Sequence, residues 1–241
     1  MFWSRHTEHG LAGTVDIGFT DRHGGPAGHD LDLGGAAGAA ASAATRAALA
    51  AVAEAFAVGR LAAMRQVHGA DVVVVTDPAD EPPVCDALVT ARADVALCAR
   101  VADCVPVVLA DSDAGIVGVA HAGRRGVVAG VVPATVAALE DLGAGRLRGW
   151  IGPHICGGCY EVPGELRAEV ARSCPAAFGC TTWGTPSVDL GAAVAAQLAD
   201  AGVEAVAVGG CTRESPDLFS YRRDGDAAGR FAGVVVWRGR P

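Results

Sequence analysis

The chain has no lysine, so all 19 of its permanently cationic side chains are arginines. Lysine Schiff bases and lysine nucleophiles are therefore excluded as catalytic devices. Every apolar run is shorter than the ~18–20 uncharged residues that cross a bilayer. The opening MFWSRHTEHG has neither the basic flank and apolar stretch of a secretory signal nor the Arg/Ser-rich character of a transit peptide. We therefore expect a cytoplasmic protein that does not enter a membrane.

Positive charge is scarce in general. The formal net charge is −8, and basic residues are dense only in GRRG at 123–126 and SYRRDG at 220–225. A nucleic-acid surface needs a cationic stripe that follows the phosphate backbone, so we expect no nucleic-acid partner. Apolar residues make up 51 % of the chain, which favours a folded core over disorder.

Hydrophobic patterns predict a single domain of strands and helices, because no linker or long repeat divides the chain. We expect helices in four places: 40–56, about 127–142 with Pro133 in the first turn or at a kink, 163–174, and 189–202 ended by Gly202. We expect strands at 14–20, on either side of Gly69 within 61–77, twice within 86–104, in a 105–122 hairpin that turns at DSDAG, after 148, within 203–211 and at 232–237.

The hairpin brings a thiol near an imidazole. A turn centred near residue 113 places residue i opposite about 226 − i, so Cys104 faces Ala122. A register change of one residue would make Cys104 and His121 direct partners, with Cβ atoms about 4.5–5.5 Å apart, which suits two ligands of one metal. Pro106 cannot donate a ladder hydrogen bond, so we expect this end of the strand at an edge or rim with access from outside.

His68 is the candidate for a third ligand. It lies in RQVHGADVVVV between two strand segments, beside Gly69, where the chain bends. Catalytic zinc has three protein ligands and an open position, and one thiolate with two neutral imidazoles leaves the ion a net positive charge that polarises an oxygen or acidifies a water. The residues alone also fit a small buried cysteine and simple hydrogen-bonded histidines.

Eight cysteines would suit a disulfide framework only in a small exported chain, so we expect reduced thiols. Beside His154, Cys156 and Cys159 form CGGC, which has the spacing of half a zinc site. No second such pair occurs, so a zinc ribbon is not expected. A redox dithiol is an alternative, and the glycines more simply indicate a tight loop.

Several motifs together carry a family resemblance. In order, they are GFTDRHGG, QVHGADV, DALVT, ADCVPVVLAD, GVAHAGRRG, IGPHICGGCYEV, CT and FSYRRDG. Over nearly its whole length the chain resembles the laccase-domain family, also called the multicopper polyphenol oxidase or, in bacteria, the peptidoglycan editing factor family. The family's zinc ligands map onto His68, Cys104 and His121. We expect one domain over 1–241 of the α+β (mixed α/β) class, with central mixed/antiparallel β-sheets flanked by helices in α/β/β/α layers.

The resemblance implies a purine nucleoside phosphorylase. Adenosine, inosine, guanosine or methylthioadenosine would react with phosphate to give the base and ribose 1-phosphate, and adenosine deamination would be a second activity. Arginines bind phosphate by bidentate contacts. The candidates are Arg46, Arg125 and Arg222, with Arg124 a fourth, although each also fits a solvated surface position.

The chain departs from the family pattern at two of these positions. Thr45 precedes Arg46 where the family commonly has Asn, and Arg124 replaces a usual Trp, which puts base stacking there in doubt. Asp103, beside Cys104, is expected to act as an acid/base group or to orient a ligand. Its alternative is a strand-end cap or ion-pair partner.

Three other functions compete with this interpretation. Seven histidines without a His-x-His pair argue against a copper-driven polyphenol oxidase, although Cu²⁺ outbinds Zn²⁺ at most such sites and would fit the same three ligands. Cys104 as nucleophile with His121 as base would make a hydrolase that edits wrong amino acids in cell-wall precursors. A non-catalytic zinc-binding module is the third. Neither the preferred nucleoside nor the oligomeric state follows from the sequence.

Overall fold

The computed structural model describes residues 1–34, 41–59, 61–77 and 81–240. The strands in these ranges are β1 Phe2–Gly10, β2 Gly13–Thr20, β3 Leu61–Ala62, β4 Val72–Val74, β5 Ala87–Thr90, β6 Ala96–Val101, β7 Val105–Asp111, β8 Ile116–Ala122, β9 Arg148–Ile151, β10 Phe178–Cys180, β11 Pro186–Val188, β12 Glu204–Ala207 and β13 Phe231–Gly239. The α-helices are α1 Ala43–Ala55, α2 Arg124–Ala129, α3 Val131–Asp141, α4 Gly164–Ser173, α5 Leu190–Asp200 and α6 Tyr221–Asp224.

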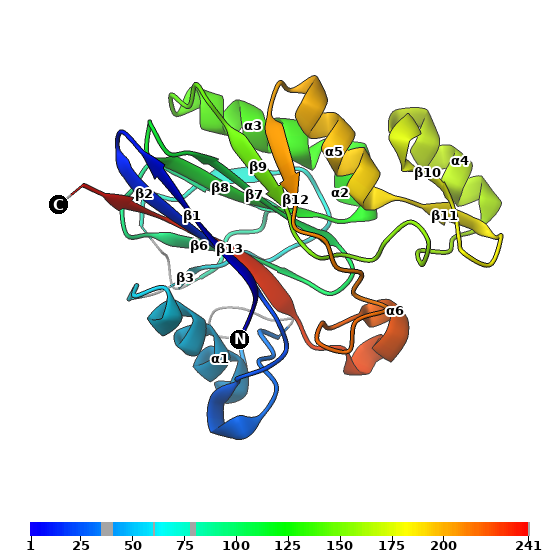
Figure 1. Ribbon diagram of the computed structural model, residues 1–241, viewed down its shortest axis with the longest axis horizontal. Coiled ribbons are helices and arrows are strands. Elements are labelled where there is room, and N and C mark those ends of the chain that lie inside the picture. The colour runs from blue at the N-terminus through cyan, green and yellow to red at the C-terminus, as the bar shows by residue number, and fades with distance from the viewer. Residues whose placement is uncertain (35–40, 60, 78–80, 241) are drawn as a thin grey trace.

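Two large sheets face each other between helices. One has the strand order β1-β2-β13-β6-β3 and the other β12-β9-β7-β8-β5-β4, while β10 and β11 form a separate ribbon. Helix α1 packs on the outer face of the first sheet, and α2, α3 and α5 cover the outer face of the second (Figure 1). Both sheets mix parallel and antiparallel pairs. The expected mixed sheets and α/β/β/α layers are therefore confirmed.

The valine-rich strands are buried on both faces because they lie in the middle of this stack. In β7, Val107 and Leu109 pack toward the helices, whereas Val108 and Ala110 pack against the other sheet. Strand β13 repeats the pattern, since Val234 packs on the α1 side. Each valine or leucine removed from water in this way contributes about 1.5–3 kcal/mol before chain entropy is counted. This burial explains near-continuous apolar runs where a half-exposed strand would alternate with polar residues.

The helix expected near 127–142 is two helices. α2 and α3 meet at Gly130, whose φ of 86° is left-handed and ends the first helix before the second begins. Pro133 lies in the first turn of α3, where a missing N–H costs no helical hydrogen bond. The expected helix at 189–202 is α5, and Gly202 follows it with a φ of 72°. The α1 prediction holds over the described part, beginning after the N-cap Ser42.

Three details of the strand predictions were wrong. Strands β1, β10 and β11 were missed. The side chains of β1 are mostly polar and half exposed, as befits the edge strand that pairs only with β2, and β10 and β11 are short strands that pair only with each other. The hairpin pairs Val105 with Ala122 and Pro106 with His121, one residue away from the expected register. β7 is a central strand of its sheet, so the prediction that Pro106 lies on an edge strand was wrong. Pro106 does lie near the end of β7, so the alternative, a position at the rim of the sheet, was correct. Within the described ranges, no helix is both long and apolar enough to cross a bilayer.

Candidate active site and its metal ligands

The three expected ligands meet at one end of the second sheet. His68 lies in the loop between β3 and β4, Cys104 immediately precedes β7, and His121 lies in β8. Their ligand atoms all lie within 4.8 Å of one another, and the Nε2 of His68 is 3.8 Å from the Sγ of Cys104. The two imidazole rings meet edge to face with centroids 4.7 Å apart. One sulfur and two nitrogens so placed match the ligands of a three-coordinate catalytic metal site.

Asp86, which sequence reasoning gave no role, supports two of these ligands. Its carboxylate is fully buried and accepts hydrogen bonds from the N–H groups of Val67, His68 and Gly69 at 3.2, 2.9 and 2.6 Å. It also accepts the Nδ1–H of His121 at 2.8 Å, which leaves the Nε2 of that ring as the lone-pair nitrogen for a ligand bond. The signal in the sequence is a single acid at the head of an apolar strand, CDALVT.

Backbone geometry makes room for the ligands. His68 adopts a φ of 61°, a left-handed conformation that costs a non-glycine residue about 1–3 kcal/mol. The hydrogen bonds to Asp86 hold this conformation. A Cβ at Gly123 would lie 2.6 Å from the Cδ2 of His68 and 3.1 Å from the Sγ of Cys104. Glycine at 123 is therefore required for the thiol and the imidazole to come together.

The thiol and the buried imidazole shift each other's protonation. Burial raises the pKa of the Cys104 thiol, but the charge and hydrogen bond of His121, with those of His68, outweigh it and lower that pKa to about 6. Burial lowers the pKa of His121, but the Cys104 thiolate and the Asp86 carboxylate outweigh it and raise that pKa to about 9. At neutral pH the pair is a thiolate beside an imidazolium, and a metal that binds both must displace a proton from the ring.

The trio lines a pocket of about 510 Å³, a size typical of small-molecule sites. Its walls combine apolar and aromatic side chains with arginines, which suits a ligand that has a flat apolar part and an anionic part. The lining residues are Gly34, Arg65, Gln66, His68, Arg100, Val101, Ala102, Asp103, Cys104, His121, Ile155, Tyr160, Leu190, Tyr221, Arg222 and Arg230.

Of the three arginines expected to bind phosphate, Arg222 lines the pocket. Its guanidinium lies 4.9 Å from the Tyr160 ring centroid and donates to the carbonyl of Glu161 at 2.7 Å. Arg125 and Arg46 are outside the described lining. Arg125 donates to the carbonyl of Val67 at 3.2 Å, beside the ligand loop. Arg46 donates to the carbonyl of Ala41 at the start of α1.

Asp103 lies in the pocket wall with its carboxylate already engaged. One oxygen accepts the hydroxyl of Thr212 and the other accepts the N–H of Arg222, both at 2.6 Å. Its φ is 85°, another left-handed non-glycine residue beside a ligand. These bonds connect the Cys104 segment to the chain near α6, so the contacts seen are those of a positioning residue.

Arg124, where the family usually has Trp, lies beside Tyr160. Burial and the Cys104 thiolate raise the pKa of the Tyr160 hydroxyl, while the charge and hydrogen bond of Arg124 oppose that rise. The ring of Tyr160 lines the pocket, so it supplies the aromatic face that is missing at position 124.

Sequence reasoning missed Tyr160 and three lining arginines, Arg65, Arg100 and Arg230. Arg100 had the clearest signal, because it lies inside the apolar strand ALCARV and is almost completely buried. Its guanidinium donates to the carbonyls of Leu33, Gly34 and Met64 at 3.1–3.2 Å. A buried arginine in a strand is rare enough to indicate a fixed role.

Comparison with known proteins shows the family of the chain. Residues 16–238 match the family described as multi-copper polyphenol oxidoreductase laccase. A Streptomyces coelicolor protein named purine nucleoside phosphorylase is 50 % identical over 98 % of this chain and 99 % of its own. A Mycobacterium tuberculosis protein of the same name is 41 % identical over 96 % and 97 %.

Solved structures give the same result. The crystal structure of Neisseria meningitidis protein NMB0706 is 30 % identical and superposes with a TM-score of 0.82 over 98 % of this chain and 99 % of that one. That of YlmD from Geobacillus stearothermophilus is also 30 % identical, with a TM-score of 0.81 over 93 % and 92 %. With a match over most of its length, the chain belongs to the multi-copper polyphenol oxidoreductase laccase family.

Proposed function

We propose that the chain catalyses the phosphorolysis of purine nucleosides, namely adenosine, inosine, guanosine or methylthioadenosine. A phosphate oxygen forms a bond to the anomeric carbon, the bond from that carbon to the purine nitrogen breaks, and the base leaves with the electron pair and gains a proton. The observation that carries the proposal is one pocket that holds both the His68, Cys104 and His121 trio and a group of arginines. The names of the two relatives point the same way.

Zinc is the metal that we assign to the trio, with Cu²⁺ as the competitor. The donor set fits, because one thiolate and two imidazoles are ligands typical of catalytic zinc and Gly123 leaves the space clear. When bound, zinc supplies a Lewis acid that polarises an oxygen of the substrate or a water. Asp86 fixes the ring orientation of His121 and the loop of His68.

The arginines supply the charge for phosphate. Guanidinium groups bind phosphate oxygens through paired N–H donors. Arg222 is the first candidate, because its neighbours Tyr160 and Glu161 hold it over the pocket wall. Arg46 and Arg125 stay as candidates of second rank. Thr45, next to Arg46, packs close to the lining residue Gly34, so the start of α1 lies beside the pocket.

The apolar wall suits the purine. Ile155, Leu190 and the ring of Tyr160 face the pocket, and aromatic or aliphatic side chains stack on the flat face of a base. Adenosine deamination is our second proposed activity at the same site, with water in place of phosphate and ammonia and inosine as products. Asp103 is proposed to take part by holding the Arg222 segment beside Cys104.

A second candidate function has its own supporting observation. The lowered pKa of Cys104, beside His121, is what a Cys/His hydrolase needs for its nucleophile. Such an enzyme would keep its activity in the presence of a chelator and lose it to a thiol alkylator. A metal-dependent phosphorylase loses activity to both, and a zinc-binding module that is not an enzyme releases no base in either case.

The decisive experiment incubates the purified zinc-loaded chain with adenosine, inosine and methylthioadenosine, each with and without phosphate, and separates the products by chromatography. We expect free base only when phosphate is present, and inosine from adenosine without it. His68→Ala should abolish base release, whereas Cys180→Ser, which removes an exposed thiol that belongs neither to the trio nor to the pocket lining, should not. Base release that is equal with and without phosphate would contradict the proposal.

A further inference from the structure

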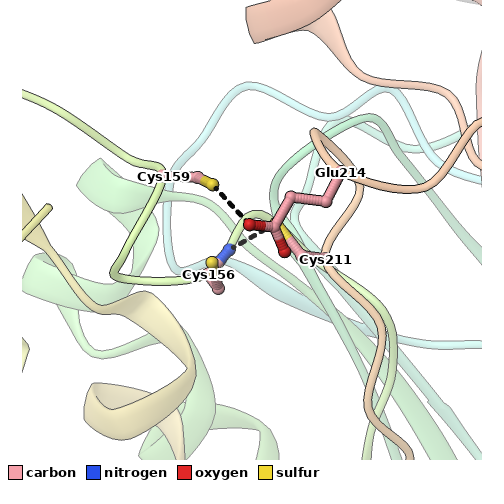
Figure 2. Close-up of side chains that lie close together, drawn as sticks. All are labelled: Cys156, Cys159, Cys211 and Glu214. Carbon is pink, nitrogen blue, oxygen red and sulfur yellow. Dashed lines mark hydrogen bonds between the residues drawn. The ribbon is translucent and has the colours of Figure 1, made fainter. Parts of the chain in front are cut away.

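A second group of potential metal ligands lies outside the trio. Cys156, Cys159, Cys211 and Glu214 place three sulfurs and a carboxylate oxygen within 4.8 Å of one another. Figure 2 shows the four side chains turned toward one another from two separate stretches of chain. None of these side chains belongs to the pocket lining described above, so the substrate chemistry proposed there leaves the cluster without a role.

The cluster is built from two similar turns. In the first, the N–H groups of Cys159 and Tyr160 donate to the carbonyl of Cys156 at 2.9 and 3.0 Å. In the second, the N–H groups of Glu214 and Ser215 donate to the carbonyl of Cys211 at 3.2 and 2.9 Å. Each turn therefore presents one ligand at its first position and another at its fourth. CGGC is thus one half of a site whose other half, CTRE, ends in a carboxylate and not in a cysteine.

Backbone hydrogen bonds fix the two turns side by side. His154 forms a parallel bridge with Cys211, in which the His154 N–H donates to Gly210 at 3.2 Å and the Thr212 N–H donates to His154 at 3.1 Å. The imidazole of His154 is directed elsewhere, with its Nδ1 2.8 Å from the carbonyl oxygen of Gly152. The main chain therefore fixes the spacing of the four ligands independently of their side chains.

We propose that Cys156, Cys159, Cys211 and Glu214 together bind one zinc ion at a closed, structural site. Three thiolates and a carboxylate complete a tetrahedron, so no position is left for a substrate. Zn–S bonds of about 2.3 Å place tetrahedral ligands about 3.8 Å apart, and the present spread of up to 4.8 Å needs a contraction of about an ångström, within the reach of side-chain rotation. Sulfur-rich sets select zinc over magnesium or calcium.

Two contacts within the cluster are those expected around such an ion. The N–H of Cys156 points at the Sγ of Cys211 at 3.4 Å, the kind of outer hydrogen bond that stabilises a metal-bound thiolate. The thiol of Cys159 donates to the Oε1 of Glu214 at 3.4 Å, so zinc would take the place of this proton between two of its ligands and would also displace the thiol protons of Cys156 and Cys211. Arg213 is in hydrogen-bonding contact with Cys159 and partly offsets the negative charge of the four ligands.

Zinc at this site would brace one wall of the pocket. The first turn continues into Tyr160 and Glu161, which hold Arg222, and the second contains Thr212, which donates to Asp103. Binding both turns to one ion fixes the position of Arg222 relative to the Cys104 segment. We therefore expect loss of this zinc to loosen the pocket without removing the metal of the trio.

The test is the metal content of the full chain, purified under reducing conditions, supplied with zinc and freed of loose metal by gel filtration. We expect about two zinc ions per chain, and about one in each of His68→Ala, Cys159→Ser and Glu214→Gln. Cys180→Ser, the matched control at an exposed cysteine outside both groups, should keep two. No nucleoside is present, so the result does not depend on the proposed enzymatic activity.

Cobalt gives a second readout that needs no variant of the cluster. Sulfur-to-cobalt charge transfer grows with the number of thiolates, three in the cluster against one in the trio. The strong near-ultraviolet band should therefore persist in His68→Ala. Three results would overturn the inference: a zinc content in Cys159→Ser equal to that of the unmodified chain, a cobalt band that disappears in His68→Ala, or a disulfide between Cys156 and either other cysteine in protein kept reduced.

Discussion

Replacing Asp86 with asparagine should damage both the fold and the proposed metal site, because this one buried carboxylate accepts hydrogen bonds from four N–H donors. Its Oδ1 accepts from His68 N–H and the Nδ1–H of His121, and its Oδ2 accepts from Val67 and Gly69. An amide has one acceptor oxygen, so whichever way it turns, two of the four N–H groups face an NH₂ group.

Hydrogen bonds to a charged group contribute about 1.5–3 kcal/mol each, so losing two lowers the free energy of unfolding by about 3–6 kcal/mol. The orientation of His121 is lost as well, and removal of such an outer-shell partner lowers metal affinity about 10–100-fold. These two effects are separable, because the first is measured on metal-free protein.

Urea unfolding of the metal-free chain and zinc titration against a competing chelator measure the two quantities. Asp71→Asn is the matched control, since it makes the same chemical change at an exposed carboxylate in the loop that carries His68, and it should change the unfolding free energy by less than ~0.5 kcal/mol. If Asp86→Asn lost less than about 1 kcal/mol and kept its zinc affinity, the view that Asp86 organises this site would be refuted.

Three further variants test other parts of the structure. Gly123→Ala puts a Cβ 2.6 Å from the Cδ2 of His68, so zinc affinity in the same titration should fall about tenfold or more with little change in stability; unchanged affinity would show that the ring has room to move. Asp111 accepts four backbone N–H bonds, which hold its pKa below the ordinary value of 3.8. The resulting stabilisation is complete above that pH and is lost as the pH falls through the lower native value. Asp111→Asn should therefore cost about 3–6 kcal/mol at pH 7, with the difference from the unmodified chain shrinking below about pH 4 in urea melts; a gap that is constant with pH would contradict this. Arg222→Ala should raise the KM for phosphate about 10–100-fold in steady-state kinetics, whereas Arg46→Ala and Arg125→Ala should raise it less. A larger increase in KM for either of the latter two variants would show that its arginine, and not Arg222, binds the phosphate.

The approach of Cys104 to His121 was predictable because local patterns placed it, whereas the choice of His68 as their partner depended mainly on the family resemblance. Two apolar runs joined by a short turn predict a hairpin, and any nearby register brings Cys104 close to His121. The register itself was off by one because Asp111 belongs to β7 and not to the turn. Its carboxylate accepts from Asp113 and Ala114, and Gly115 closes the turn with a φ of 71°. A side chain that caps its own turn is easily counted as part of the loop.

Contacts between distant segments were not predictable in the same way. Asp86 joins residues 17 to 35 positions away, and the Cys156 and Cys211 turns meet across 55 positions through a parallel bridge. No period in a single sequence encodes such a meeting. The order of the sheets was likewise available only through the family resemblance. The single-domain organisation over 1–241 stays a prediction, although the two sheets share one core.

The arginine-only character of the chain carries through to the pocket. The permanently cationic side chains that line the pocket are all arginines, and a guanidinium group ordinarily releases its proton only above pH 12, beyond the alkaline range in which an ammonium group becomes neutral. If the proposed phosphorolysis holds, a decline in phosphate binding between about pH 8 and pH 11 is therefore expected to originate in a group other than a guanidinium.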